Sequence, residues 1–256
     1  MIPAACVRRP TRQTGFSMVE LMVGAVLGTL LLGGVYRLWS NSQAESHRLQ
    51  KKIELRNQMT LSSKKIQRSI TLAGLGFKSA PKLLKTDAPG SDTLMIYTNL
   101  PEASTVLAMD VAGDLGVALV ANATIFQYTS FVAVTDSLGG EVRRILRREG
   151  PKLILVSTLS RGYSRTSSKI YPVRQEKFYT DQSTNQLVSV VDDRASIMGN
   201  AIRNFQVSFR NRLGEPTEIA TEIRSVTYSF SGMYPAKDKA LNSVIFSSTA
   251  IPRNIL

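Results

Sequence analysis

The sequence predicts an α+β fold, in which a long N-terminal helix packs against a head of mostly antiparallel β-strands. Three observations predict it. Residues 16–36 form one apolar run, residues 37–72 contain no glycine or proline, and short β-type runs alternate with turns beyond residue 81. Helical and strand-forming patterns that occupy separate parts of a chain are typical of an α+β architecture.

The composition limits the chemistry open to the chain. Its 256 residues suffice for one or two domains, and it holds one cysteine, Cys6, and one histidine, His47. These counts exclude a disulfide framework and a Cys/His zinc site. The adjacent carboxylates Asp192 and Asp193 follow a β-type run and predict a turn rather than a catalytic pair. We therefore expect no enzymatic activity, no cofactor and no bound metal.

The formal net charge of +13 suggests a binder of nucleic acid or of an anionic surface when it is taken for the whole chain. The charge is unevenly distributed, however. Residues 1–15 carry +3 and residues 45–85 carry +8, whereas residues 86–256 carry only +2. The basic character therefore belongs to the N-terminal third, and the large C-terminal part is close to neutral.

The apolar run at residues 16–36 is long enough to cross a membrane. Its 21 residues, FSMVELMVGAVLGTLLLGGVY, contain one charge, and as a helix they would span about 30 Å. A buried helix of a soluble domain is the alternative, but the run has no polar face. A cleaved secretory signal is disfavoured because no small-x-small site follows. The lysines and arginines on both sides leave the orientation open.

Glu20 is the single charged residue of this run. A carboxylate inside an apolar membrane helix costs about 2.5–3.5 kcal/mol on insertion scales, so such a residue is a functional candidate with a partner to be found. Snorkelling to the membrane interface is the alternative, although a glutamate side chain is short for that role.

The segment from Thr14 to Leu21, TGFSMVEL, follows three arginines and precedes the apolar run. It resembles the class III leader junction of type IV pilins and pseudopilins. The resemblance implies that prepilin peptidase removes residues 1–15 by cutting after Gly15 and then methylates Phe16. It also implies that Glu20 is the family's acidic residue, that the leader is cytoplasmic and that the head lies outside.

Physical chemistry agrees with this resemblance. The amine of Phe16 in one subunit could approach Glu20 of a staggered neighbour, so that two charges enter the apolar environment as a pair. Gly24 and Gly28 form a Gly-x-x-x-Gly spacing that lets helices approach closely, with chance occurrence as the alternative. Hinge candidates are Gly33 and Gly34.

Residues 38–73 predict an amphipathic stalk that continues the membrane-spanning half at residues 16–37. Apolar residues expected to pack on the head are Leu49, Ile53, Met59, Ile66, Ile70 and Ala73. The +8 charge of residues 45–85 has three interpretations. It could lie on a helix face that is solvated or neutralised by acidic neighbouring subunits, it could contact anionic lipid headgroups, or it could bind DNA. DNA binding is the weakest of the three, because residues 40–76 hold no aromatic side chain for stacking.

Residues 74–256 predict a β-rich head after a loop at 81–91. Residues 196–202 predict a short helix, while 136–140 and 148–151 predict hairpin turns. The expected strands cover residues 92–98, 116–121, 125–135, 141–148, 152–158, 169–179, 186–191, 205–212, 223–231 and 243–251.

Several head segments are similar to PilW-type minor pilins and GspJ-type pseudopilins. They are KIQR followed by AGLGF at residues 65–77, GSDTL at 90–94, IRNFQVSF at 202–209 and VIFSSTAIPRN at 244–254. The head departs from many pilins in having no cysteine, and therefore no C-terminal disulfide loop.

Four arginines flank a dipeptide on one predicted strand. Strand alternation would place Arg143 and Arg147 on one face and Arg144 and Arg148 on the other. A solvated strand edge is one interpretation, and a docking patch for a neighbouring subunit or an acidic ligand is the other.

Together these features predict a minor pilin or pseudopilin in the inner membrane, with a periplasmic head, that joins a type IV pilus or its priming complex. Expected partners are prepilin peptidase and other minor and major pilins. A type II secretion pseudopilin, a signal-anchored periplasmic enzyme or sensor, and a DNA-uptake component are the alternatives.

Overall fold

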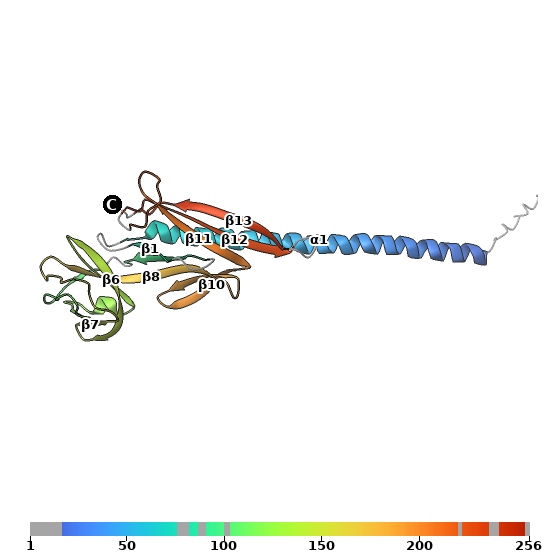
Figure 1. Cartoon of the computed structure of the whole chain (residues 1–256). Coiled ribbons are helices and arrows are strands. Elements are labelled where there is room, and N and C mark those ends of the chain that lie inside the picture. The colour runs from blue at the N-terminus through green and yellow to red at the C-terminus, as the bar shows by residue number, and fades with distance from the viewer. Residues whose placement is uncertain are drawn as a thin grey trace, which may run out of the picture. The chain divides into compact units, whose positions relative to one another are not determined.

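The structure, a computed structural model, describes residues 17–75, 82–86, 91–99, 103–219, 222–235 and 241–253. The chain divides into two compact units, Met1–Gln50 and Lys51–Leu256. Helix α1 (Met18–Leu72) begins in the first unit and ends in the second (Figure 1). A long N-terminal helix followed by an antiparallel β-sheet head confirms the predicted α+β fold.

The larger sheet of the second unit has the strand order β1-β2-β8-β5-β6-β7-β4, with β3 and β9 also paired to β8 and β10 paired to β9. All of its pairs are antiparallel, and a short 3-10 helix η1 (Thr124–Phe126) precedes β5. The strands are β1 (Leu83–Thr86), β2 (Thr93–Thr98), β3 (Thr105–Val106), β4 (Val117–Leu119), β5 (Phe131–Asp136), β6 (Gly139–Glu149), β7 (Lys152–Leu155), β8 (Lys169–Asp181), β9 (Gln186–Val191) and β10 (Arg194–Asn200).

The smaller sheet has the order β11-β12-β13, with β11 at Ile202–Arg210, β12 at Ser225–Pro235 and β13 at Leu241–Ala250. Val226, Tyr228 and Phe230 occupy alternate positions of β12 and are all buried, as is typical of a strand with one face in the core. Gly232 lies where the helix approaches this strand closely, because a Cβ there would be 2.8 Å from Met59 Sδ. The small residue thus lets α1 pack directly on β12.

The C-terminal turns of α1 supply one wall of the main hydrophobic core. The buried apolar residues of this wall are Leu55, Met59, Ile66 and Ile70 of α1, together with Ala73 directly after it, each at most 5% exposed. They pack with residues of β2, β8, β11 and β12. Full burial of such a side chain stabilises the fold by about 1.5–3 kcal/mol, so this stripe holds the helix to the head.

The predicted stripe was wrong at its N-terminal end. Leu49 is 47% exposed and Ile53 is 58% exposed, whereas Leu55, absent from the prediction, is buried. At about 100° per residue, Ile53 points roughly 140° away from Ile66, so it cannot lie on the same helix face.

Polar side chains add a second set of contacts between α1 and the sheets. The hydroxyls of Ser63 and Tyr228 lie 2.7 Å apart, and Tyr228 also donates to the Ser63 carbonyl at 3.0 Å. Ser69 donates to Glu176 Oε2 at 2.6 Å, and Lys65 lies 3.6 Å from Glu176 Oε1. These buried and half-buried groups fix the rotation of the helix, because each would lose its partner if the helix turned.

Most predicted strands are confirmed, with three corrections. Residues 196–202 were expected to form a helix but lie mainly in strand β10. The turn predicted at Asp192 and Asp193, by contrast, is confirmed. Their positive φ angles of 46° and 67° close the β9–β10 hairpin with a two-residue turn. The expected loop at 81–91 contains β1, and the expected strand at 125–135 begins as η1.

Candidate functional site

The start of α1 is closed by a capping box. Ser17 Oγ accepts the N–H of Val19 at 3.4 Å, and Glu20 Oε2 accepts the N–H of Ser17 at 3.3 Å. The spacing Ser-x-x-Glu thereby satisfies two backbone donors that a helix start leaves without partners. The sequence predicted a role for Glu20 between subunits but not this local one, which the spacing itself could have indicated.

The carboxylate of Glu20 also lies at the positive end of the helix dipole, in the first turn of α1. Its side chain is exposed in the isolated chain. One backbone N–H at 3.3 Å and a helix dipole do not neutralise a full charge, so most of the cost of placing this group in a membrane remains. Pairing with a cation would offset this free-energy cost.

Two glycines continue the line of Glu20 along the helix. Gly24 and Gly28 follow it at intervals of four residues, so the three positions share one face of α1. A Cβ built at either glycine meets no atom within 4 Å, which leaves this face open to another helix. The structure therefore brings the acidic residue and both small residues onto one accessible strip.

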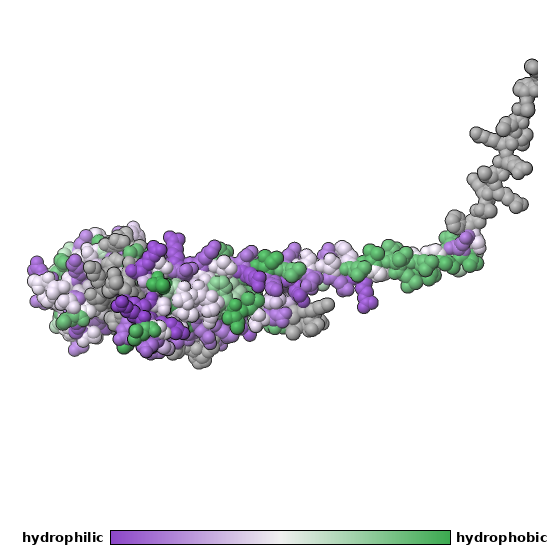
Figure 2. Space-filling model, turned by 90° about the horizontal axis from the view of Figure 1, so that it is seen from above, coloured by the Kyte–Doolittle hydropathy of each residue, from purple (hydrophilic) through white to green (hydrophobic). Residues whose placement is uncertain are grey.

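The rest of this helical segment is apolar and uncovered. An 18-residue window reaches a mean hydropathy of 2.0, and none of that window is buried within the structure. Figure 2 shows hydrophobic residues gathered along this part of the helix. Leu31 and Leu32 are each 71% exposed. An apolar surface of this extent needs lipid or protein around it, so the segment supports membrane anchoring.

The remaining N-terminal predictions have different outcomes. α1 runs without interruption through Gly33 and Gly34, so their role as a hinge stays a prediction. Gly15 and Phe16, the expected cleavage and methylation positions, lie outside the described residues.

The four arginines of β6 all have partners within the head. Arg143 forms an ion pair with Glu141, Arg144 lies 2.6 Å from Asp193 Oδ2, and Arg147 lies 2.9 Å from Glu149 Oε1. Arg148 donates to a backbone carbonyl at 2.8 Å. These contacts agree with a solvated surface on which the arginines are neutralised by carboxylates of the same chain. Docking of a neighbouring subunit or an acidic ligand on these arginines stays a prediction.

The expected alternation along β6 is wrong. The register of β6 against β7 shifts between Ile145 and Arg147, which inserts one extra residue into β6. Such a bulge reverses the side-chain parity beyond it, so Arg143 and Arg147 do not follow a common alternation. Sequence patterns carry no signal for the position of this bulge.

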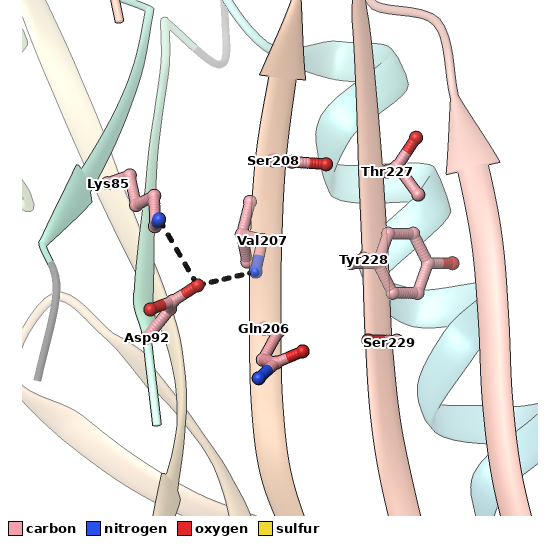
Figure 3. Close-up of a pocket in the computed structure, with 8 residues that line it drawn as sticks. All are labelled: Lys85, Asp92, Gln206, Val207, Ser208, Thr227, Tyr228 and Ser229. Atoms are coloured by element: carbon pink, nitrogen blue, oxygen red, sulfur yellow. Dashed lines mark hydrogen bonds and ion pairs between the residues drawn. The ribbon is translucent and has the colours of Figure 1, made fainter. Parts of the chain in front are cut away.

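A hollow of about 390 Å³ lies between the two sheets (Figure 3). Its charged pair is Lys85 and Asp92, whose Nζ and Oδ2 atoms are 3.4 Å apart. The same carboxylate oxygen accepts the N–H of Val207 at 2.6 Å. Asp92 therefore ties the start of β2 to β11, and the described residues that line the hollow include no cysteine or histidine.

No group of three or more His, Cys, Asp or Glu side chains that could hold a metal ion occurs in the described part of the chain. Among the described carboxyl groups, that of Asp192 has a pKa raised above its usual range, because burial disfavours its charged form. It sits in the β9–β10 turn, where its Oδ1 accepts the N–H of Gln175 at 3.1 Å. This hydrogen bond gives it a structural role.

Comparison with known proteins identifies the N-terminal segment. Residues 10–36 match the family described as the prokaryotic N-terminal methylation motif. No curated protein matches the chain. The matched segment contains Glu20 and both glycines of the strip, and it ends at Tyr36 within the exposed apolar helix. The match and the fold together support a type IV pilin-like or pseudopilin-like protein that is processed by a prepilin peptidase.

Proposed function

We propose that this chain is a minor pilin or pseudopilin. It is made as a prepilin, cleaved after Gly15, methylated at Phe16 and held in the inner membrane, with its leader in the cytoplasm and its head in the periplasm. It then joins a type IV pilus or the complex that primes one. The observation that carries this proposal is the coincidence of the methylation motif with an exposed apolar helix.

Assembly depends in this proposal on the strip formed by Glu20, Gly24 and Gly28. The methylated amine of a neighbouring subunit pairs with Glu20, and the two glycines let the helices approach closely. The proposed role is structural, so that the chain takes part in assembly and carries out no reaction; the match to the methylation motif supports this role.

The β6 arginines are a secondary docking surface in this proposal, at which an acidic region of a neighbouring subunit exchanges with the internal partners. The head segments similar to PilW-type proteins favour a minor pilin, and the closest alternative function is that of a type II secretion pseudopilin of GspJ-like type. Neighbouring genes would separate the two, since minor pilin genes favour the pilus and secretion genes favour the pseudopilus.

The experiment compares the wild-type chain with Gly15→Val in cells that assemble pili. Immunoblots of sheared filaments and of membranes should show the wild-type chain in both, and the variant unprocessed and confined to membranes. A signal-anchored enzyme or sensor would be indifferent to the substitution. A DNA-uptake component acting through the stalk would show steeply salt-dependent DNA binding.

A further inference from the structure

The smaller sheet ends in a long strand edge that no described residue covers. β13 pairs with β12 over ten consecutive residues without a register shift, and it is the last strand of its sheet (Figure 1). Its sequence, LNSVIFSSTA, contains no charge and no proline. Charged residues, prolines, bulges and short length are the usual means of protecting a strand edge, and β13 has none of them.

The edges of the larger sheet are protected in these ways. β4 has three residues, and β1 has four, including Lys85. β10 carries Arg194 and a register shift between Ile197 and Gly199. The contrast within one head indicates that the open edge of β13 is a specific feature and not a general property of the fold.

Parity shows which backbone groups this edge presents. Met233 donates its N–H to Ala201 on the β11 side, so the odd-numbered residues of β12 face β11 and its even-numbered residues face β13. In the β12–β13 register Tyr228 opposes Ser248, and Phe230 opposes Phe246. The even-numbered residues of β13 therefore bond to β12, while residues 243, 245, 247 and 249 direct their N–H and C=O groups outward.

The side chains of these outward-bonding residues are exposed as well. Ile245 is 75% exposed, and Ser243, Ser247 and Thr249 are exposed beside it. A charged strand placed here would lose hydration without gaining a counter-charge. An uncharged strand with hydroxyl and β-branched residues would find backbone partners and suitable cross-strand neighbours.

The direction of β13 argues against a second copy as the occupant. Tyr234 lies against Lys52, Gly232 against Met59 and Tyr228 against Ser63, so β12 runs opposite to α1 and β13 runs along it. An antiparallel pair of two β13 strands about a two-fold axis would turn the two helices in opposite directions. Two copies anchored in one membrane, as the proposed function requires, need helices that point the same way.

We infer that β13 is a docking edge that accepts an uncharged extended strand from a different neighbouring subunit, which enlarges the three-stranded sheet by strand addition. The contact joins the heads of two subunits, and it is separate from the strip on α1 that the proposed function assigns to helix pairing.

The test uses the full chain in detergent and a synthetic peptide with the sequence of residues 241–251 and blocked ends, as an uncharged probe strand. Residue-resolved amide exchange is measured with and without millimolar peptide. The inference predicts that the amides of residues 243, 245, 247 and 249 slow at least tenfold, whereas the amides of the even-numbered residues stay unchanged.

Ser247→Pro and Ser247→Ala are the matched variants. Proline removes an outward N–H that β12 does not use, so it should abolish the protection without lowering the melting temperature, whereas alanine should bind as the wild type does. Unchanged odd-numbered amides, or equal binding by both variants, would overturn the inference. Protection that grows with the concentration of the chain alone would assign the edge to a second copy and also overturn it. Neither result depends on leader processing.

Discussion

Glu20 has two separable roles in this account, and paired substitutions can distinguish them. Glu20→Gln keeps a side-chain oxygen that can accept the Ser17 N–H, now at 3.3 Å, but removes the charge. Ser17→Ala removes the hydroxyl that accepts the Val19 N–H at 3.4 Å and leaves the charge in place. The first variant therefore tests pairing between subunits, and the second tests the helix cap.

The magnitudes differ enough to be measured. Loss of an N-cap hydroxyl costs about 0.5–2 kcal/mol of local helix stability, which a membrane helix with a long apolar run tolerates. An unpaired carboxylate in the apolar region costs about 2.5–3.5 kcal/mol, and the pairing in the assembled state must offset most of that cost. Even half of it corresponds to about a tenfold change in an equilibrium constant. We expect Glu20→Gln to reduce incorporation at least tenfold.

The assay expresses each variant as a tagged second copy beside the wild-type chain. The ratio of tagged protein in sheared filaments to that in membranes is read by immunoblot, and intact mass confirms equal processing. Ser17→Ala should give a ratio within about twofold of the wild type. If Glu20→Gln were incorporated into filaments as well as the wild type, and incorporation of Ser17→Ala were impaired, Glu20 would act only as a helix cap. That result would refute the pairing argument.

Three further predictions concern packing and electrostatics. Ile66→Ala should lower the free energy of unfolding of the head by about 2–5 kcal/mol because Ile66 is fully buried, whereas Ile53→Ala at an exposed position should change it by less than about 0.5 kcal/mol; similar melting of the two would contradict the assigned helix face. Gly28→Leu should leave helicity and processing unchanged, since no atom lies within 4 Å, but reduce filament incorporation; normal incorporation would show that the glycine strip plays no part in assembly. Asp192→Asn should stabilise the head at neutral pH by less than about 1 kcal/mol, because burial raises the pKa of this carboxyl and its charged form is disfavoured in the fold. That advantage should vanish in thermal melts below about pH 3.8, where the carboxyl is protonated in both states; a pH-independent difference would show that burial of the charged carboxylate is not its cause.

Periodic and local signals in the sequence predicted the architecture well. The glycine-free stretch and the apolar run predicted α1, and the expected strand at 223–231 corresponds to most of β12. Asp192 and Asp193 were expected in a turn, which their positive φ angles confirm. The cap made by Ser17 and Glu20 was also within reach of the sequence, because the Ser-x-x-Glu spacing is a known helix-start signal.

Features that depend on tertiary packing were beyond the sequence. The helix face was misjudged because Leu49 and Ile53 are apolar yet exposed, while Ser63 and Ser69 are polar yet buried by their partners Tyr228 and Glu176. Burial of a serine is favourable only when a hydrogen-bond partner is in place, and that partner lies more than 100 residues away in the chain.

Irregular strand pairing was a second feature that the sequence could not predict. The bulge in β6 and the strand character of β10 arise from pairing with β7 and β9, which set the register independently of local preference. The open edge of β13 likewise became visible only once the order of strands was known.

The most direct test of the central claim is the intact mass of the chain extracted from membranes of cells with and without prepilin peptidase. With the peptidase, the chain should begin at Phe16 and carry one added methyl group at its N-terminus. Without the peptidase, it should keep residues 1–15 and carry no methyl group. A chain that still begins at Met1 in the presence of an active peptidase would show that it is not processed as a prepilin.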